Sequence, residues 1–246
     1  MYEELAEILR NSDNIVFFGG AGVSTESNIP DFRSEEGLYN AKSNYGMSPE
    51  QMISHSFFVN DTQTFFDYYK KNLIYTDAEP NDAHKALAKL EEMGKLKAVV
   101  TQNIDGLHQK AGSKTVYELH GSVLRNNCMK CGAPFDLDYV MDPAHCDGMI
   151  PKCDKCGGIV KPDVVLYEES LDDYQISGAV EAIRNADVLI IGGTSLVVYP
   201  AAGFINYFRG SKLVLINKSS TSFDSRADLV IHDPIGKVMK GALDAL

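Results

Sequence analysis

Two closely spaced pairs of cysteines carry the strongest chemical signal in this sequence. Cys128 and Cys131 form one Cys-x-x-Cys pair, and Cys153 and Cys156 form the other. Two such pairs can converge as four thiolates around one tetrahedral zinc ion, although the 21 residues between them slightly exceed the usual spacing. Because a closed four-thiolate site has no open coordination position, we expect this zinc to be structural. The alternative, two redox-active pairs, would need a thioredoxin-like context that the sequence lacks. We do not expect the fifth cysteine, Cys146, to be a metal ligand.

A glycine-rich turn follows an apolar run near the start of the chain. It contains Gly19, Gly20 and Gly22, followed by Ser24 and Thr25. Glycines in such a turn let the backbone approach a pyrophosphate, whose charge is met by peptide N–H groups at the start of the next helix. Thr25 stands where the dinucleotide fingerprint has its third glycine, so the pattern alone leaves a turn without a ligand as an equal alternative.

One histidine is a candidate general base. Histidine titrates near neutral pH, and His120 lies in the segment ELHGS just before the cysteine-rich region. For any single histidine a packed or capping role is commoner, and the residues alone leave that alternative open. The remaining histidines are interpreted as structural, namely His55, His84, His108, His145 and His232.

The composition indicates a globular protein with an acidic surface. The 246 residues are 44% hydrophobic, enough for one large domain with an insertion or for two unequal domains. A formal net charge of −11 repels nucleic-acid backbones and attracts basic partners, so we expect no direct nucleic-acid binding. No apolar run approaches the roughly 18 to 20 residues of a membrane span, and the first residues are acidic, unlike a signal peptide. We therefore expect a cytoplasmic protein without a membrane partner.

Apolar runs alternate with amphipathic stretches, which is typical of strand and helix units around a parallel sheet. Each run ends in glycine or small polar residues, at the strand end where open α/β sheets bind ligands. Residues 81–94 have helical spacing, with Asn81 or Asp82 as cap and Gly94 as stop. The four clearest runs are residues 14–18, 98–100, 187–191 and 213–216.

Two segments interrupt this alternation. Residues 35–80 are rich in serine, asparagine, tyrosine and phenylalanine, and Ser48, Pro49 and Gln51 mark the start of a helix, so we expect a loop and a small helical insertion. Residues 125–160 hold all five cysteines and little periodicity, which is typical of a module stabilised by a metal.

The segment 20–34, GAGVSTESNIPDFRS, closely resembles the sirtuin family. Further blocks of the family follow in order, namely TQNID at 101–105, LHG at 119–121, the cysteine pairs, KPDVV at 161–165 and GTS at 193–195. The resemblance implies a Rossmann-like parallel sheet with helices on both faces plus a small zinc-binding domain. The NAD-binding domain would comprise residues 1–34, 81–124 and 161–246, interrupted by the insertion 35–80 and the zinc module 125–160.

The resemblance also implies an activity. Sirtuins are NAD-dependent protein-lysine deacetylases that transfer the acetyl group of acetyl-lysine to ADP-ribose and release nicotinamide. The released nicotinamide is also expected to inhibit the enzyme. Acetyl-lysine proteins or peptides would be the partners, NAD the consumed co-substrate and zinc a structural ion. Three alternatives are a hydride-transferring dehydrogenase, for which no acidic residue on a second strand is evident, a zinc-ribbon binding module, and mono-ADP-ribosylation.

Carried over residue by residue, the resemblance names the site. His120 would be the general base and Asn103 a second catalytic residue. The cofactor would contact Gly20, Ala21, Gly22, Thr25, Asp31, Phe32, Arg33, Gln102, Asn103, Ile104, Asp105, His120, Gly193, Thr194, Ser195, Asn217 and Ile235. The substrate peptide would add a strand beside Val164, Val165, Leu166, Tyr167 and Val197.

The acyl group would reach the helical insertion. Sirtuin relatives that remove succinyl or malonyl groups carry a tyrosine and, three residues later, an arginine on one face of this helix. Phe66 and Tyr69 occupy those positions here, which predicts an apolar pocket and a preference for neutral acyl groups. Tyr68 and Lys71 have the same spacing on another face, and in that alignment Lys71 could replace the arginine.

Overall fold

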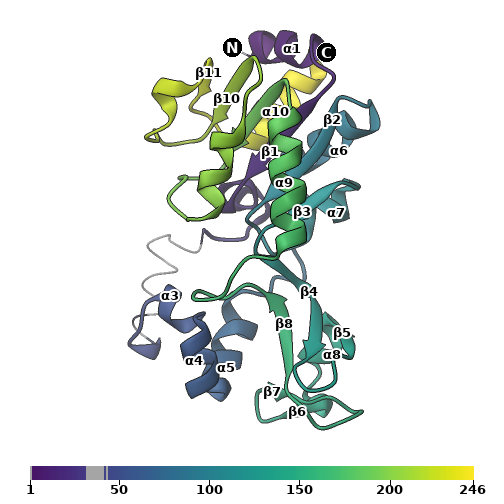
Figure 1. Ribbon diagram of the computed structural model, residues 1–246, viewed down its shortest axis with the longest axis vertical. Helices are drawn as coiled ribbons and strands as arrows, with labels where there is room; N and C mark the ends of the chain where they lie inside the picture. The colour runs from purple at the N-terminus through teal and green to yellow at the C-terminus, as the bar shows by residue number, and fades with distance from the viewer. Residues whose placement is uncertain (1, 32–41, 43) are drawn as a thin grey trace.

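A six-stranded parallel sheet forms the larger part of the molecule (Figure 1). The computed structural model describes residues 2–31, 42 and 44–246. All four apolar runs expected as strands are strands, and they lie side by side at the centre of the sheet. The strand order is β11 (Leu229–Ile231), β10 (Lys212–Ile216), β9 (Val188–Gly192), β1 (Ile15–Gly19), β2 (Leu96–Thr101) and β3 (Val116–Glu118).

Helices cover both faces of this sheet, as expected (Figure 1). Successive side chains of a strand point to opposite faces, so Ile15 and Phe17 of β1 join one hydrophobic cluster while Val16 and Phe18 join the other. The first cluster is closed by helices α1 (Tyr2–Arg10), α6 (Asp82–Glu92) and α10 (Ile235–Asp244). The second cluster is closed by α9 (Asp173–Asn185) and the 3-10 helix η4 (Ala201–Tyr207).

Helix α6 begins and ends where the sequence predicts. The Asn81 side chain accepts a hydrogen bond from the Ala83 N–H, and His84 Nδ1 accepts one from the Asn81 N–H. The chain leaves the helix after Met93 through Gly94, whose φ of +75° is favourable for glycine. The short helix α7 (Leu107–Ala111) packs beside α6.

A second, antiparallel sheet of three strands lies below the first in Figure 1. Its order is β5 (Pro134–Asp136), β4 (Gly121–Cys128) and β8 (Val160–Val164). Helix α8 (Leu137–Met141) and the hairpin of β6 (Cys146–Asp147) and β7 (Ile150–Pro151) complete this end of the molecule. The expected limits of the zinc module, 125 and 160, fall inside β4 and at the first residue of β8.

The helical insertion packs against this small sheet. It consists of α3 (Pro49–Met52), α4 (His55–Asn60) and α5 (Thr62–Asn72), and the expected cap is present because Ser48 and Gln51 form a capping box. Buried aromatic side chains of α4 and α5 share one hydrophobic cluster with Val123, Val164 and Leu166. None of the described helices combines the length and the apolar character that a membrane span requires.

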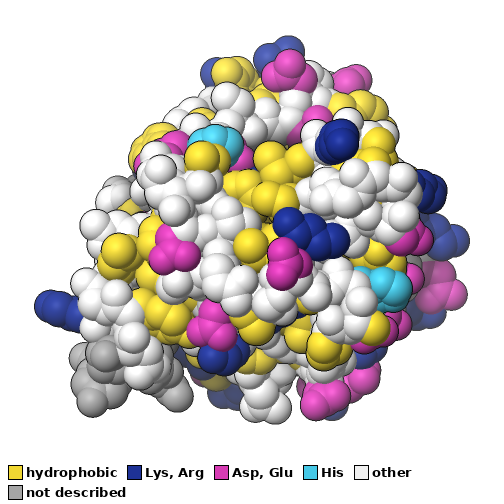
Figure 2. All heavy atoms as spheres, turned by 90° about the horizontal axis from the view of Figure 1, so that it is seen from below, with side chains coloured by type: hydrophobic (Ala, Val, Ile, Leu, Met, Phe, Trp, Pro, Cys, Tyr) yellow, Lys and Arg dark blue, Asp and Glu magenta, His cyan; other side chains and the backbone are white. Residues whose placement is uncertain are grey.

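The surface at this end of the molecule carries mixed charge. Seen from below, the described acidic and basic side chains are interspersed and form no continuous basic area on this face (Figure 2).

Candidate active site

A cavity of about 1580 Å³ lies between the carboxyl edge of the large sheet and the small sheet. Parallel strands end at a common edge, so the segments that follow β1, β2 and β9 meet there. The structure brings most of the expected site residues into this cavity. They are Gly20, Ala21, Thr25, Asp31, Gln102, Asn103, Ile104, Asp105, His120, Val164, Val165, Leu166, Tyr167, Gly193, Thr194 and Ser195.

Six expected residues do not line the cavity or are not described, and Gly22 is one of them because it packs behind the wall. Phe32 and Arg33 lie outside the described residues. Ile235 is 3% exposed in the core beneath the sheet, and Asn217 Nδ2 donates to the Ser219 carbonyl beyond β10. Val197 is 60% exposed and, unlike its neighbour Val198, is not part of the cavity wall.

The glycine turn packs directly against the turn after β9. The Gly22 N–H donates to the Gly193 carbonyl at 2.8 Å, and a Cβ atom on Gly22 would lie 2.8 Å from Gly193 Cα. A Cβ atom on Gly20 would lie 2.9 Å from Thr194 Cβ. Residues without side chains are therefore required at both positions, and Gly20 leaves bare backbone at the cavity wall, as a dinucleotide pyrophosphate needs.

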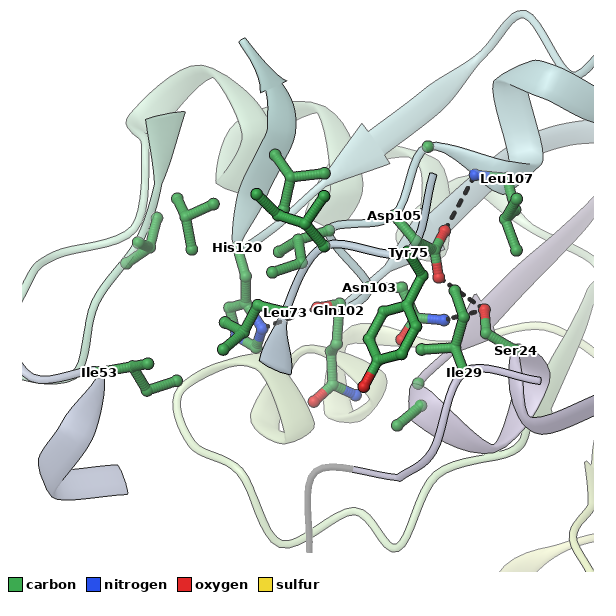
Figure 3. A pocket seen from close by; sticks show the side chains of 18 of the residues that line it. Ser24, Ile29, Ile53, Leu73, Tyr75, Gln102, Asn103, Asp105, Leu107 and His120 are labelled. Carbon is green, nitrogen blue, oxygen red and sulfur yellow. Dashed lines mark hydrogen bonds between the residues drawn. The ribbon is translucent and has the colours of Figure 1, made fainter. Parts of the chain in front are cut away.

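Three polar side chains that line the cavity form a hydrogen-bonded chain, in which Ser24 is buried and Asn103 and Asp105 are half-buried (Figure 3). Asn103 Nδ2 lies 3.0 Å from Ser24 Oγ, and the Ser24 hydroxyl donates to Asp105 Oδ2 at 2.6 Å. The Leu107 N–H donates to the other Asp105 oxygen at 2.9 Å. Burial raises the pKa of Asp105, although these two hydrogen bonds oppose that shift by stabilising the carboxylate.

Ser24 is a site residue that the sequence analysis did not single out. Its side chain is buried and links the glycine turn after β1 to the segment after β2. The available signal was its place in the GAGVST block, where it is the first hydroxyl after the glycines.

His120 is oriented by the backbone of a neighbouring segment (Figure 3). Its Nδ1 atom lies 2.9 Å from the Gln102 carbonyl oxygen. A carbonyl only accepts, so Nδ1 carries the proton and the basic lone pair of the neutral ring belongs to Nε2. His120 thereby has the tautomer of a general base that acts through Nε2.

The segment expected to bind the peptide is fixed on both sides. The Val165 N–H donates to the His120 carbonyl at 3.0 Å, while the Tyr167 N–H donates to the Ile53 carbonyl at 3.0 Å. Between them, the Leu166 N–H donates to the Glu169 carboxylate at 2.9 Å. This segment therefore joins the candidate base to the helical insertion.

Of the two residue pairs considered for acyl specificity, one lies in the hydrophobic core and the other lines the cavity. Phe66 and Tyr69 are fully buried in the cluster of the helical insertion and do not belong to the cavity wall. Tyr68 and Lys71 do line the cavity, as the second alignment requires. However, Lys71 Nζ lies 2.6 Å from Asp67 Oδ1 and its charge is therefore already paired.

The four paired cysteines converge, as the sequence predicts. Their Sγ atoms all lie within 4.8 Å of one another, with Cys128 and Cys156 at 3.4 Å and Cys131 and Cys153 at 3.7 Å. Tetrahedral zinc with bonds of about 2.3 Å would place its sulfur ligands roughly 3.8 Å apart, so the donor set fits. The N–H groups of Cys131 and Lys130 point to Cys128 Sγ and lower the pKa of this thiol to about 6.

Fold and site together define a doubly wound dinucleotide-binding protein with an attached four-thiolate zinc module. Comparison with known proteins gives the same class. The profile of the Sir2 family matches residues 20–200. The chain belongs to the Sir2 family.

Curated relatives and solved structures match over nearly the full length. Proteins named NAD-dependent protein deacetylase from Clostridium acetobutylicum and Clostridium perfringens are each 66% identical, covering 96% and 98% of this chain and the same shares of their own lengths. A solved structure described as Sir2-p53 peptide-NAD+ has a TM-score of 0.87 at 35% identity, covering 99% of this chain and 98% of its own. One described as Sir2 bound to acetylated peptide has a TM-score of 0.87 at 34% identity, with the same coverage.

Proposed function

We propose that this chain is an NAD-dependent protein-lysine deacetylase that transfers the acetyl group of acetyl-lysine to ADP-ribose and releases nicotinamide. One observation carries the proposal: the candidate base His120, the Ser24 chain with Asn103 and Asp105, and segment 164–167 all border one cavity. The names of the 66% identical clostridial relatives support the same activity.

Each group has a task that follows from its geometry. His120 accepts a proton from a ribose hydroxyl at Nε2, because Nδ1 is held by the Gln102 carbonyl. Asn103 and Asp105 hold the nicotinamide amide at the half-buried end of the cavity, with Asn103 positioned by its contact with Ser24. Bound NAD supplies a ribose carbon that becomes electrophilic as its bond to nicotinamide breaks.

The other residues of the cavity are assigned to the remaining parts of NAD and to the peptide. The backbone of Gly20, Ala21 and Gly22 faces the pyrophosphate, and Thr194 and Ser195 face the adenosine half, while segment 164–167 and the turn around Val197 receive the acetyl-lysine peptide as an added strand. Released nicotinamide can rebind beside Asp105, so it acts as a product inhibitor. Zinc on the four cysteines stabilises the small sheet.

A mass-spectrometric assay tests this function. The purified protein is incubated with an acetyl-lysine peptide, with and without NAD. We expect a mass loss of one acetyl group on the peptide only with NAD, together with free nicotinamide and O-acetyl-ADP-ribose. An unchanged peptide, or ADP-ribose attached to protein without deacetylation, would contradict the proposal.

A further inference from the structure

The strand that follows His120 contains a bulge at the point where it passes the cavity. Strand β4 pairs with β8 at Ser122 and Asp163, and the next pair joins Asn126 to Pro162. Residues 123–125 of β4 therefore have no partner on β8. Bulges of this kind redirect side chains and are common beside functional sites.

One side of this bulge supports the nicotinamide segment. The Val123 N–H donates to the Ile104 carbonyl at 3.0 Å, between the candidate pocket residues Asn103 and Asp105. The side chain of Leu124 lies over Gly106, where a Cβ atom would come within 2.6 Å of Leu124 Cδ1. The position of segment 102–106 thus depends on the conformation of the bulge.

The other side of the bulge is held by one arginine. Arg125 Nη1 donates to Glu118 Oε2 at 2.6 Å, and Arg125 Nε donates to Asp163 Oδ2 at 2.9 Å. The Glu118 side chain is only 6% exposed, and Arg125 is the partner that the structure gives its carboxylate. A planar guanidinium can bridge two carboxylates in fixed directions, which a lysine ammonium does less well.

The two carboxylates belong to different sheets. Glu118 ends β3 of the large sheet, two residues before His120, and Asp163 lies in β8, one residue before the peptide segment at Val164. The guanidinium therefore fixes three elements relative to one another: the strand leading to the base, the bulge under the nicotinamide segment, and the strand leading to the peptide segment.

We propose that Arg125 is a positioning residue for the reaction, which sets the nicotinamide segment and His120 relative to the peptide segment by locking the β4 bulge to Glu118 and Asp163. The inference rests on the proposed deacetylase function for its kinetic consequences, but its structural part stands on these contacts. Arg125 does not line the cavity, whereas Val123 and Leu124 do, so Arg125 acts through these two neighbours.

The test compares Arg125→Gln, Glu118→Gln and the double variant with wild type. Lys89→Gln is the matched control, because it removes an exposed ion pair to Glu92 on α6, far from the bulge. The first readout is amide hydrogen exchange at Val123, which needs no activity. The second is steady-state kinetics with an acetyl-lysine peptide, including the nicotinamide concentration for half inhibition.

For Arg125→Gln we expect faster exchange at Val123, kcat lower by about ten-fold and half inhibition at about ten-fold more nicotinamide, because small displacements of reacting groups are costly. The KM for NAD should change less than about two-fold, because the pyrophosphate and adenosine contacts are far from the bulge. The double variant removes the uncompensated buried carboxylate, so its melting temperature should recover while its Val123 exchange and kcat stay altered.

Two results would overturn the inference. One is wild-type exchange at Val123 in Arg125→Gln, which would show that the bulge does not depend on the arginine. The other is full recovery of kcat in the double variant, which would reduce Arg125 to a counter-ion for Glu118. A wild-type protein that fails to deacetylate would contradict the proposed function, and the exchange measurement would still decide the structural part.

Discussion

The Nδ1 atom of His120 lies 2.9 Å from the carbonyl oxygen of Gln102, a residue that itself lines the cavity. The base is thus oriented by the main chain of the same segment that carries Asn103 and Asp105. Any movement of this segment would change both the tautomer-fixing hydrogen bond and the candidate nicotinamide pocket.

Replacing His120 tests its role as base. His120→Ala and His120→Tyr should each lower kcat by about 10² to 10⁴ with the fold intact, because general base catalysis contributes that much. His145→Ala is a matched control, since this partly exposed histidine stacks on Tyr139 outside the cavity. Turnover of the His120→Ala variant within a few-fold of wild type, with unchanged melting, would show that another group is the base.

Replacing a cysteine ligand tests the metal site. Cys131→Ser should abolish binding of one zinc per chain and destabilise the small sheet, because a module with little core of its own draws folding energy from the metal. Cys146→Ser removes the fifth thiol, which is not among the converging four, and should leave zinc content unchanged. Elemental analysis and thermal melting give both answers. Zinc-free wild-type protein would refute the site.

The buried pair His84 and His108 predicts acid sensitivity. Their rings lie 4.7 Å apart between α6 and α7, and burial lowers the pKa of His84 to about 4 and that of His108 to about 3. In the unfolded chain both bind protons near pH 6.5, so the unfolded state takes up more protons as pH falls below that value. The free energy of unfolding should therefore fall from pH 6.5 downwards, until the folded pKa values are reached.

Between pH 7 and pH 5.5 the two histidines together should remove about 2 to 3 kcal/mol from the free energy of unfolding. Urea denaturation at the two pH values measures this change. His108→Phe, which can pack beside Phe17 in the same cluster, should roughly halve it. An unaltered pH dependence in that variant would show that other groups cause the acid sensitivity.

We predict that the acyl preference depends on Lys71 and its partner Asp67. Because Lys71 is already paired, neutral acetyl and propionyl groups should be removed faster than succinyl or malonyl groups. Asp67→Asn frees the ammonium and should raise kcat/KM for succinyl-lysine relative to acetyl-lysine, whereas Lys71→Ala should not. If wild-type protein removes succinyl groups as fast as acetyl groups, Lys71 is itself the receptor for the acyl carboxylate.

Much of the fold could be predicted because its signals are local. The four central strands are uninterrupted apolar runs, and α3 and α6 start at capping residues that can be recognised within four positions. The strands β3 and β11 were not predicted, because β3 is not a continuous apolar run and β11 is followed by His232 and not by glycine or a small polar residue.

The sequence could predict those site residues that lie in recognisable motifs. The zinc ligands follow from spacing alone, and His120 was distinguished from the other histidines by the family motif around it. The link between Ser24 and Asp105 spans 81 residues and depends on how two strands align, which spacing along the chain does not reveal. For the same reason, the β4 bulge and the ion pairs of Arg125 required the structure.

Among the described residues, three connections between the large sheet with its helices and the smaller end of the molecule contribute to the cavity wall: residues 73–78, His120, and residues 164–171. A molecule bound in the cavity therefore contacts all three connections and stabilises them together. Thermal unfolding followed by calorimetry should show this as a gain in cooperativity, with the two sheets melting as one unit when NAD and peptide are present and less sharply without them. Bound ligand would thus stabilise the arrangement of the two parts of the molecule for as long as it occupies the cavity.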